Sequence, residues 1–195
     1  MELIYHCSHG GAEDVIQDEN VAVLCNEIQT VLETTRAELT STKTGNELRA
    51  TQDRILRKLA FRGWETNVRI FPLTAPSIFQ RGQYQLDATK KAPNGRTLGF
   101  ICHFGSSEFS VRKLMLISEA VRRRIVECAI VALMVRAVIP YVRGRMACYE
   151  QIQRLLLAYG TSGFVDVPMV VWGMMPEAVG IGNAGDPTAL HSMAK

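Results

Sequence analysis

The sequence predicts an α/β domain in which a mixed β-sheet is flanked by α-helices on both sides. Residues 125–135 are apolar except for Glu127, which is typical of a strand buried on both faces of a sheet. Residues 83–89 and 97–104 predict two strands of an antiparallel hairpin, because an Asn-Gly turn at Ala92–Gly95 separates them. Segments with apolar residues at helical spacing lie between the predicted strands.

The N-terminal third contains one predicted strand and two predicted helices. Residues 2–7 are rich in apolar side chains and are followed by a Ser-His-Gly-Gly loop, which indicates a strand. Residues 20–39 predict a helix that begins at an asparagine, a suitable N-cap. After a polar loop at residues 40–45, residues 46–62 predict a second helix, for which Gly63 is a suitable C-cap.

The remaining elements complete one domain. Alternating side chains over residues 65–71 predict a strand ahead of the hairpin. After the hairpin the sequence predicts a helix capped by Ser106 or Ser107, the apolar strand, a helix over 146–159 and a strand over 168–174. We therefore expect a single domain over residues 1–176 and a loose C-terminal tail, residues 177–195, rich in Gly, Ala and Asn.

Composition limits the possible classes of function. The chain has 195 residues, of which 47% are hydrophobic and 21% charged, so it predicts a globular domain. The net charge of +3 does not by itself indicate nucleic-acid binding, and the run Arg122–Arg124 is typical of a solvated surface. Five cysteines without a Cys-x-x-Cys pair predict reduced thiols rather than disulfides or a zinc site. No signal peptide or membrane span is visible, so we expect a cytoplasmic protein without a membrane partner.

Short motifs along residues 2–176 occur in the order that one known family shows. They are Ile4–His9, Gly63-Trp64, Asp87 with the strand Gly99–Gly105, Val126–Leu133, Tyr149-Glu150 and Val170–Gly173. As an ordered set they resemble the BglII/BstYI family of type II restriction endonucleases, to which BamHI is a more distant relative. The resemblance implies the PD-(D/E)XK nuclease fold, a restriction-endonuclease-like mixed sheet with helices on both sides.

The resemblance also implies a homodimer that cleaves palindromic DNA with a GATC core. In the family an Asp and a Glu on neighbouring strands hold Mg²⁺, which activates a water for phosphodiester hydrolysis. Asp87 matches the Asp and is the candidate metal ligand. Ile101 stands at the position of the Glu, and His103 at that of the Glu or Gln two residues later. Because isoleucine cannot bind a metal, we expect Mg²⁺-dependent cleavage to be impaired or lost.

Two kinds of residue could substitute for the missing carboxylate: a histidine on the same strand or a glutamate on the following helix. His103 could act as a general base, or it could make only a structural hydrogen bond. Glu108 or Glu119 could supply a carboxylate from the following helix, although the helix dipole alone explains an acidic residue at Glu108. The candidate catalytic residues are therefore Asp87, His103 and Glu119.

Candidate DNA-binding residues flank the hairpin. Lys90 and Lys91 could hold a phosphate, or they could be solvated at the end of the hairpin. Ser106 and Ser107 could contact phosphates or base edges, or act only as helix caps. Arg112 lies further along the same helix and completes the candidate set.

These observations lead to three hypotheses. The leading one is a DNA-binding protein of the BglII/BstYI family, a homodimer on double-stranded DNA, without effective Mg²⁺-dependent cleavage. The second is an active site-specific endodeoxyribonuclease that uses Mg²⁺ with a relocated carboxylate, or His103, and is accompanied by a cognate DNA methyltransferase. The third is a structural or interaction subunit that reuses the fold and needs no cofactor.

Overall fold

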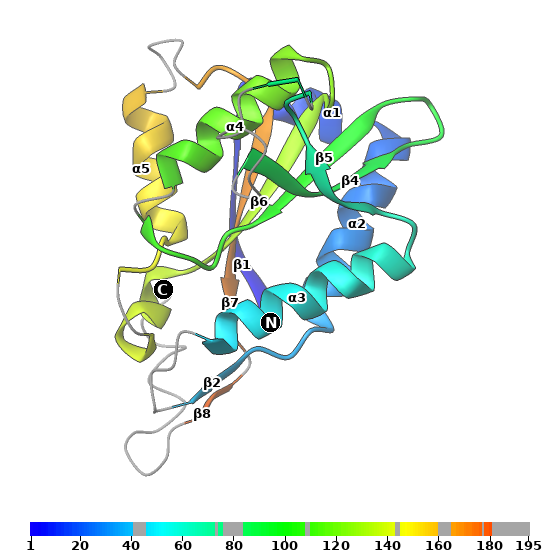
Figure 1. Ribbon diagram of the computed structural model, residues 1–195. Coiled ribbons are helices and arrows are strands. Elements are labelled where there is room, and N and C mark those ends of the chain that lie inside the picture. The colour runs from blue at the N-terminus through cyan, green and yellow to red at the C-terminus, as the bar shows by residue number, and fades with distance from the viewer. Residues whose placement is uncertain are drawn as a thin grey trace.

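The computed structural model describes residues 1–40, 46–72, 74–75, 84–107, 110–142, 145–159, 165–176 and 178–180. A six-stranded mixed sheet lies at the centre, with the strand order β1-β7-β6-β5-β4-β3 (Figure 1). Its strands are β1 (Glu2–His9), β3 (Glu65–Arg69), β4 (Gln85–Lys91), β5 (Thr97–Cys102), β6 (Cys128–Met134) and β7 (Met169–Met175). β5, β6 and β7 are parallel, whereas β1, β3 and β4 run antiparallel to their neighbours. The predicted mixed sheet is confirmed.

Helices cover both faces of this sheet, as predicted. One face carries α1 (Ala12–Ile16), α2 (Glu19–Glu33) and α3 (Asn46–Phe61), and the other carries α4 (Ser110–Arg122) and α5 (Tyr149–Tyr159). A 3₁₀ helix, η4 (Arg136–Tyr141), follows β6. β2 (Glu38–Thr40) and β8 (Ala178–Gly180) form a separate two-stranded parallel sheet. β8 lies at the start of the predicted tail. Among the described residues no helix is long and apolar enough to cross a membrane.

β6 explains why the sequence contains a continuous apolar run. Every residue of this strand is buried. Alternate side chains enter two different core clusters: Cys128, Ile130 and Ala132 pack on the side of α2 and α3. Their neighbours Ala129, Val131 and Leu133 pack on the side of α4 and α5. A central strand between two helical layers has no face left for polar residues.

The predicted turns and the end of the second helix are confirmed. Gly95 has a φ of 91° in the turn between β4 and β5. At the end of α3, the Trp64 amide donates to the Leu59 carbonyl and the Gly63 amide to the Ala60 carbonyl. Gly63 has a φ of 81°, so this is a Schellman motif with glycine in the left-handed conformation.

The predicted boundaries of two helices were wrong. The first long helix begins after Asp18, whose side chain accepts the Asn20 amide, and it ends at Glu33 rather than near residue 39. The fourth helix begins at Ser110, so neither Ser106 nor Ser107 is its N-cap. These two serines are instead tied by backbone contacts to the segment before α5, as described below. The other predicted boundaries differ from the observed ones by at most three residues.

Several expectations lie outside the described residues. These are the polar loop at 41–45, the acidic residue Glu108 and residues 177 and 181–195 of the predicted tail.

Candidate active site

The carboxylate of Asp87 is held by groups from three different elements. On β5, the backbone amide of Cys102 donates to Oδ2 at 2.8 Å. From α3, the Gln52 side-chain amide donates to the same oxygen at 3.3 Å. From α4, the Nζ atom of Lys113 lies 3.6 Å from Oδ1. The Asp87 side chain is only 12% exposed, so these contacts replace most of its hydration.

The strand pairing explains why a backbone amide is available to Asp87. The register between β4 and β5 runs from Lys91↔Thr97 to Ala88↔Phe100 and ends there. The Cys102 amide lies beyond the last of these pairs and donates to the Asp87 side chain. On its other edge β5 stays paired with β6, as far as Cys102↔Ala132. The strands therefore part beside Asp87, where the side chains of α3 and α4 reach it.

Burial dominates the electrostatics of this site. Desolvation raises the pKa of Asp87 above its ordinary value, although the Lys113 ammonium and the Cys102 amide act in the opposite direction. Desolvation, together with the neighbouring Asp87 charge, raises the pKa of the Cys102 thiol well above its usual range. Cys102 is therefore a neutral thiol at physiological pH and not a thiolate nucleophile.

Ile101 occupies an apolar environment. Its side chain is fully buried in the core cluster on the α4 side of the sheet, with 0% exposure. Its companions in this cluster include Leu86, Leu114 and Ile117. The place that the resemblance assigns to a second carboxylate is thus part of the hydrophobic core.

His103 is a neutral, buried imidazole. Its side chain is 6% exposed, and its Nε2 atom has no hydrogen-bond partner among the described residues. Desolvation and the nearby Lys113 charge lower the pKa of His103 to about 4, outweighing a backbone hydrogen bond at Ser106 that raises it. A base with so low a pKa accepts a proton weakly at neutral pH.

The structure places Glu119 away from Asp87. Glu119 accepts a hydrogen bond from the Nε atom of Arg123, which directly follows the end of α4, at 2.6 Å. It follows Lys113 by six residues, which corresponds to about 9 Å along a helix and to a different helix face. α4 thus brings a lysine, rather than this glutamate, to the carboxylate of Asp87.

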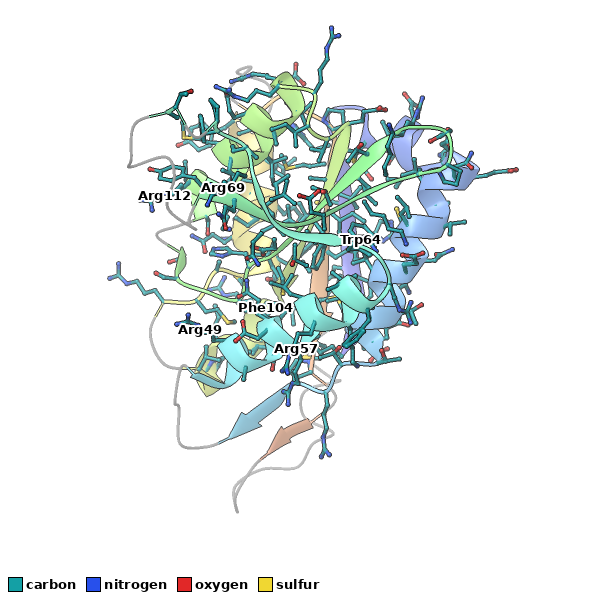
Figure 2. All side chains as sticks on the ribbon, turned by 45° about the vertical axis from the view of Figure 1, so that its right-hand side comes forward. Arg49, Arg57, Trp64, Arg69, Phe104 and Arg112 are labelled. Carbon is teal, nitrogen blue, oxygen red and sulfur yellow. The ribbon has the colours of Figure 1, made fainter. Side chains whose placement is uncertain are left out.

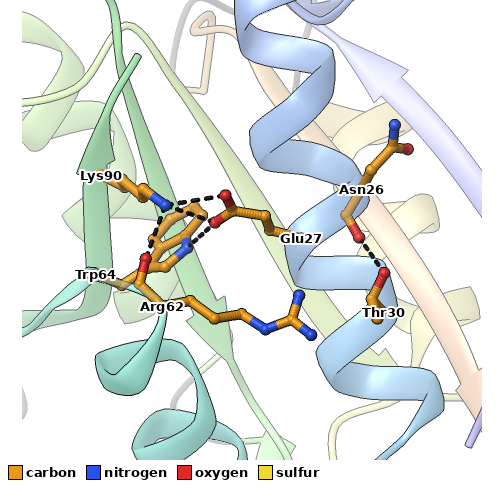
Figure 3. Close-up of polar contacts among 6 residues, drawn as sticks. All are labelled: Asn26, Glu27, Thr30, Arg62, Trp64 and Lys90. Atoms are coloured by element: carbon orange, nitrogen blue, oxygen red, sulfur yellow. Dashed lines mark hydrogen bonds and ion pairs between the residues drawn. The ribbon is translucent and has the colours of Figure 1, made fainter. Parts of the chain in front are cut away.

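Lys90 belongs to a different polar cluster, on the α2 side of the sheet (Figure 3). Its Nζ atom lies 2.7 Å from Oε2 of Glu27 and donates to the Arg62 carbonyl at 2.8 Å. The Trp64 indole donates to the same Glu27 oxygen at 2.9 Å. This cluster ties β4 to α2 and to the end of α3, and it holds the Lys90 ammonium away from Asp87.

The other candidate DNA-binding residues are dispersed. Lys91 is exposed at the hairpin end of β4, four residues or about 13 Å along the strand from Asp87. Ser106 forms a backbone bridge with Met146, and the Ser107 amide donates to the Arg145 carbonyl at 2.8 Å. Arg112 lies beside Lys113 on α4, with its guanidinium 5.9 Å from the centre of the Tyr84 ring.

The side chains around Asp87 do not fit a magnesium ion. Mg²⁺ requires several hard oxygen ligands in near-octahedral geometry. Within the described part of the chain, no group of three or more His, Cys, Asp or Glu side chains could share a metal ion. Asp87 contributes a carboxylate, but Ile101 faces the core and the nearest cation is the Lys113 ammonium.

The sequence interpretation did not identify Gln52, Arg49 or Arg69 as residues of this region. Arg49 precedes Gln52 by one helical turn, which places the two on the same side of α3. Arg69 pairs with Gln85 across β3 and β4, and Gln85 precedes Asp87 by two residues on β4. No local sequence signal links these residues, because they come together only through sheet register and helix packing.

The six-stranded mixed sheet with helices on both faces is that of a restriction-endonuclease-like α/β domain. A family model described as restriction endonuclease BglII/BglIII matches residues 5–174, and the chain belongs to this family. The crystal structure of restriction endonuclease BglII complexed with a DNA 16-mer is similar, with 15% identity, a TM-score of 0.66, and 91% of this chain and 79% of that chain covered. Free BglII gives 15% identity, a TM-score of 0.64, and 91% and 81% coverage. No curated protein sequence matches the chain.

Proposed function

We propose that this chain is a DNA-binding member of the BglII family that has lost Mg²⁺-dependent phosphodiester cleavage. The observation that carries the proposal is the set of side chains around Asp87. Asp87 is held between Gln52, Lys113 and the Cys102 amide, while Ile101 is packed into the core. Loss of one primary ligand from a two-carboxylate metal site costs on the order of 10³-fold or more in rate.

Arginines around the Asp87 site support the DNA-binding part of the proposal. Arg49 of α3, Arg69 of β3 and Arg112 of α4 are each close in the fold to a residue that contacts Asp87 or lies beside it on β4. All three lie toward the same side of the molecule in Figure 2. Positively charged side chains from separate elements that lie on one side of the molecule can contact the phosphate backbone of a duplex. The resulting electrostatic attraction weakens as the salt concentration rises.

We expect the purified protein to shift a palindromic duplex with a GATC core and to leave it uncut in Mg²⁺ or Mn²⁺. Binding should weaken steeply as the salt concentration rises, because phosphate contacts release counterions. A gel-shift titration at several salt concentrations, with a cleavage assay on the same duplex and on genomic DNA, measures both properties. The Asp87→Ala variant is the control for any cleavage that is observed.

The alternatives give different results in the same assays. Site-specific fragments that disappear in Asp87→Ala would establish an active nuclease, and His103→Ala and Glu119→Gln would then show whether either residue takes part. Absence of salt-sensitive binding to the GATC duplex and to other DNA would favour a structural or interaction subunit.

We also propose that the protein is a homodimer that uses the apolar surface of α4 and α5. Val111 and Met115 are spaced by one turn on α4, and they are 42% and 51% exposed. Tyr159 of α5 is 51% exposed. A groove between the two helices is lined by Val111, Leu114, Leu155, Tyr159 and Val165. An isologous interface formed by two helices of each protomer would remove this apolar surface from water.

Substitution of Met115 by glutamate should convert the dimer to a monomer, because two like charges would be buried at the interface. Sedimentation velocity should show twice the mass of one chain for the parent and the mass of one chain for the variant. Val23→Glu is the matched control, since Val23 is 56% exposed on α2, which covers the opposite face of the sheet. A Met115→Glu variant that stays dimeric would exclude this surface as the interface.

A cytoplasmic location is part of the proposal, whereas a cognate DNA methyltransferase belongs to the alternative of an active nuclease. The five cysteines are all free, as expected for a reducing compartment. A methyltransferase gene next to the gene of this protein would favour restriction activity, because a nuclease that cuts host DNA requires protection of the host sites.

A further inference from the structure

We propose that the Lys113 ammonium is a built-in cation that takes the place of a divalent metal beside Asp87, and that duplex DNA is bound without a metal ion. The inference deepens the proposed DNA-binding function and rests on it for its DNA arm. Lys113 is the fourth residue of α4, and its side chain is only 17% exposed. A lysine covered to this degree is unusual unless it is paired.

The packing of α4 directs Lys113 to Asp87. Leu114 and Ile117 of the same helix are buried in the core cluster on the α4 side of the sheet. Burial of this apolar face fixes the rotation of the helix about its axis. With that rotation fixed, Nζ of Lys113 comes within 3.6 Å of Oδ1 of Asp87. The ion pair therefore follows from the packing of α4 on the sheet, and Lys113 is not a mobile surface side chain.

The Asp87 carboxylate has no oxygen left without a partner. Its Oδ2 atom accepts from the Cys102 amide and from Gln52, and its Oδ1 atom faces the ammonium. A divalent ion would have to displace that ammonium, and it would then find a single carboxylate because Ile101 offers no ligand. Both the charge and the ligand set thus favour the lysine over a metal.

The ammonium also determines the charge that the site presents to DNA. An unpaired Asp87 carboxylate would repel a phosphate near Arg49, Arg69 and Arg112. Lys113 cancels this charge, so that the arginines dominate the local field. Its removal should therefore weaken DNA binding through exposure of the carboxylate, and a divalent cation should then compensate by neutralising Asp87.

The test is fluorescence anisotropy with the GATC-core duplex, in EDTA and in Ca²⁺ at matched ionic strength. The parent should bind equally in both buffers. Lys113→Met should bind about tenfold more weakly in EDTA, a change of about 1.4 kcal/mol, and should recover in Ca²⁺. The double variant Lys113→Met, Asp87→Asn should recover in EDTA, because the repelling charge is gone. Lys113→Gln is a second variant in case the methionine variant does not fold.

Lys58→Met is the matched control, because it also replaces one lysine by methionine. Lys58 lies in the last turn of α3, where its ammonium donates to the Thr34 carbonyl and not to Asp87. It should bind almost like the parent and show no Ca²⁺ dependence. A parent that requires Ca²⁺, or a Lys113→Met variant that behaves like Lys58→Met, overturns the built-in cation while DNA binding itself stands.

Electron paramagnetic resonance can measure Mn²⁺ binding in the absence of DNA. This measurement tests the role of Lys113 independently of the proposed DNA-binding function. The parent should take up no Mn²⁺. Lys113→Met should show weak uptake, since Asp87 is then a single free carboxylate, and Asp87→Asn should abolish it. If the parent fails to bind any duplex, the DNA-binding function fails and the Mn²⁺ measurement still decides the role of Lys113. Uptake of Mn²⁺ by the parent that depends on Asp87 would overturn the inference.

Discussion

Substitution of Ile101 by glutamate should destabilise the fold strongly and should not restore cleavage. Ile101 is fully buried among apolar side chains, so the new carboxylate would lose its hydration without gaining a partner. We expect a loss of about 4 kcal/mol in the free energy of unfolding at pH 8, measured by urea titration. Cleavage should stay absent in Mg²⁺, because Lys113 still faces Asp87.

The pH dependence of this loss identifies its cause. The folded-state pKa of the introduced glutamate should be raised above its unfolded value of about 4.3, because burial disfavours the charged form. The variant should therefore lose stability relative to the parent as pH rises above that value, and regain part of it at pH 4. Ile101→Gln should show a loss that hardly changes with pH, and Ile101→Val only about 1 kcal/mol. A glutamate variant that is as stable as the parent and cuts DNA in Mg²⁺ would show that position 101 still opens into a working metal site.

Acidification should destabilise the parent more than a His103→Gln variant. The folded-state pKa of His103 is lowered to about 4, whereas an unfolded histidine titrates near 6.5. Below pH 6.5 the unfolded state therefore binds a proton that the folded state does not, so the free energy of unfolding falls as pH falls from about 6.5 to about 4. At pH 5 the contribution of His103 should be about 2 kcal/mol relative to pH 8.

Urea titrations of the parent and of His103→Gln at pH 8, 6 and 5 measure this difference. The remaining histidines are present in both proteins, so their contributions cancel in the comparison. Glutamine has no proton to gain in this range, and the variant should have the flatter pH profile. Parallel profiles for the two proteins would mean that His103 is protonated in the folded state as easily as in water, contrary to its burial.

Much of the fold could be predicted because its signals are local. The apolar run of β6 follows from burial on both faces, and the end of α3 follows from the need for a left-handed residue at Gly63. The first long helix was predicted too long, because helical spacing alone did not show that the chain leaves the helix after Glu33. The fourth helix was predicted to start too early, because Ser106 and Ser107 are good capping residues that tertiary contacts recruit elsewhere.

Residues of the site could be predicted only in part. The hairpin places Asp87 and Ile101 on neighbouring strands, and the family resemblance implies altered metal chemistry because isoleucine stands where the family has a glutamate. The partners of the lysines do not follow from the hairpin. Lys90, for which phosphate contact and solvation were both left open, pairs with Glu27 of α2, whereas Lys113 reaches Asp87.

By itself the sequence determined the class of fold, because this depends on periodicity and turn chemistry. It also gave the family resemblance, which implies a carboxylate at position 101, where the chain has isoleucine. Only the tertiary structure decided which side chains surround Asp87. The position of Lys113 depends on the rotation of α4 over the sheet, and that of Gln52 on the packing of α3. Both are set by burial of side chains distant in sequence, and a long, flexible lysine takes whichever partner this packing brings within reach.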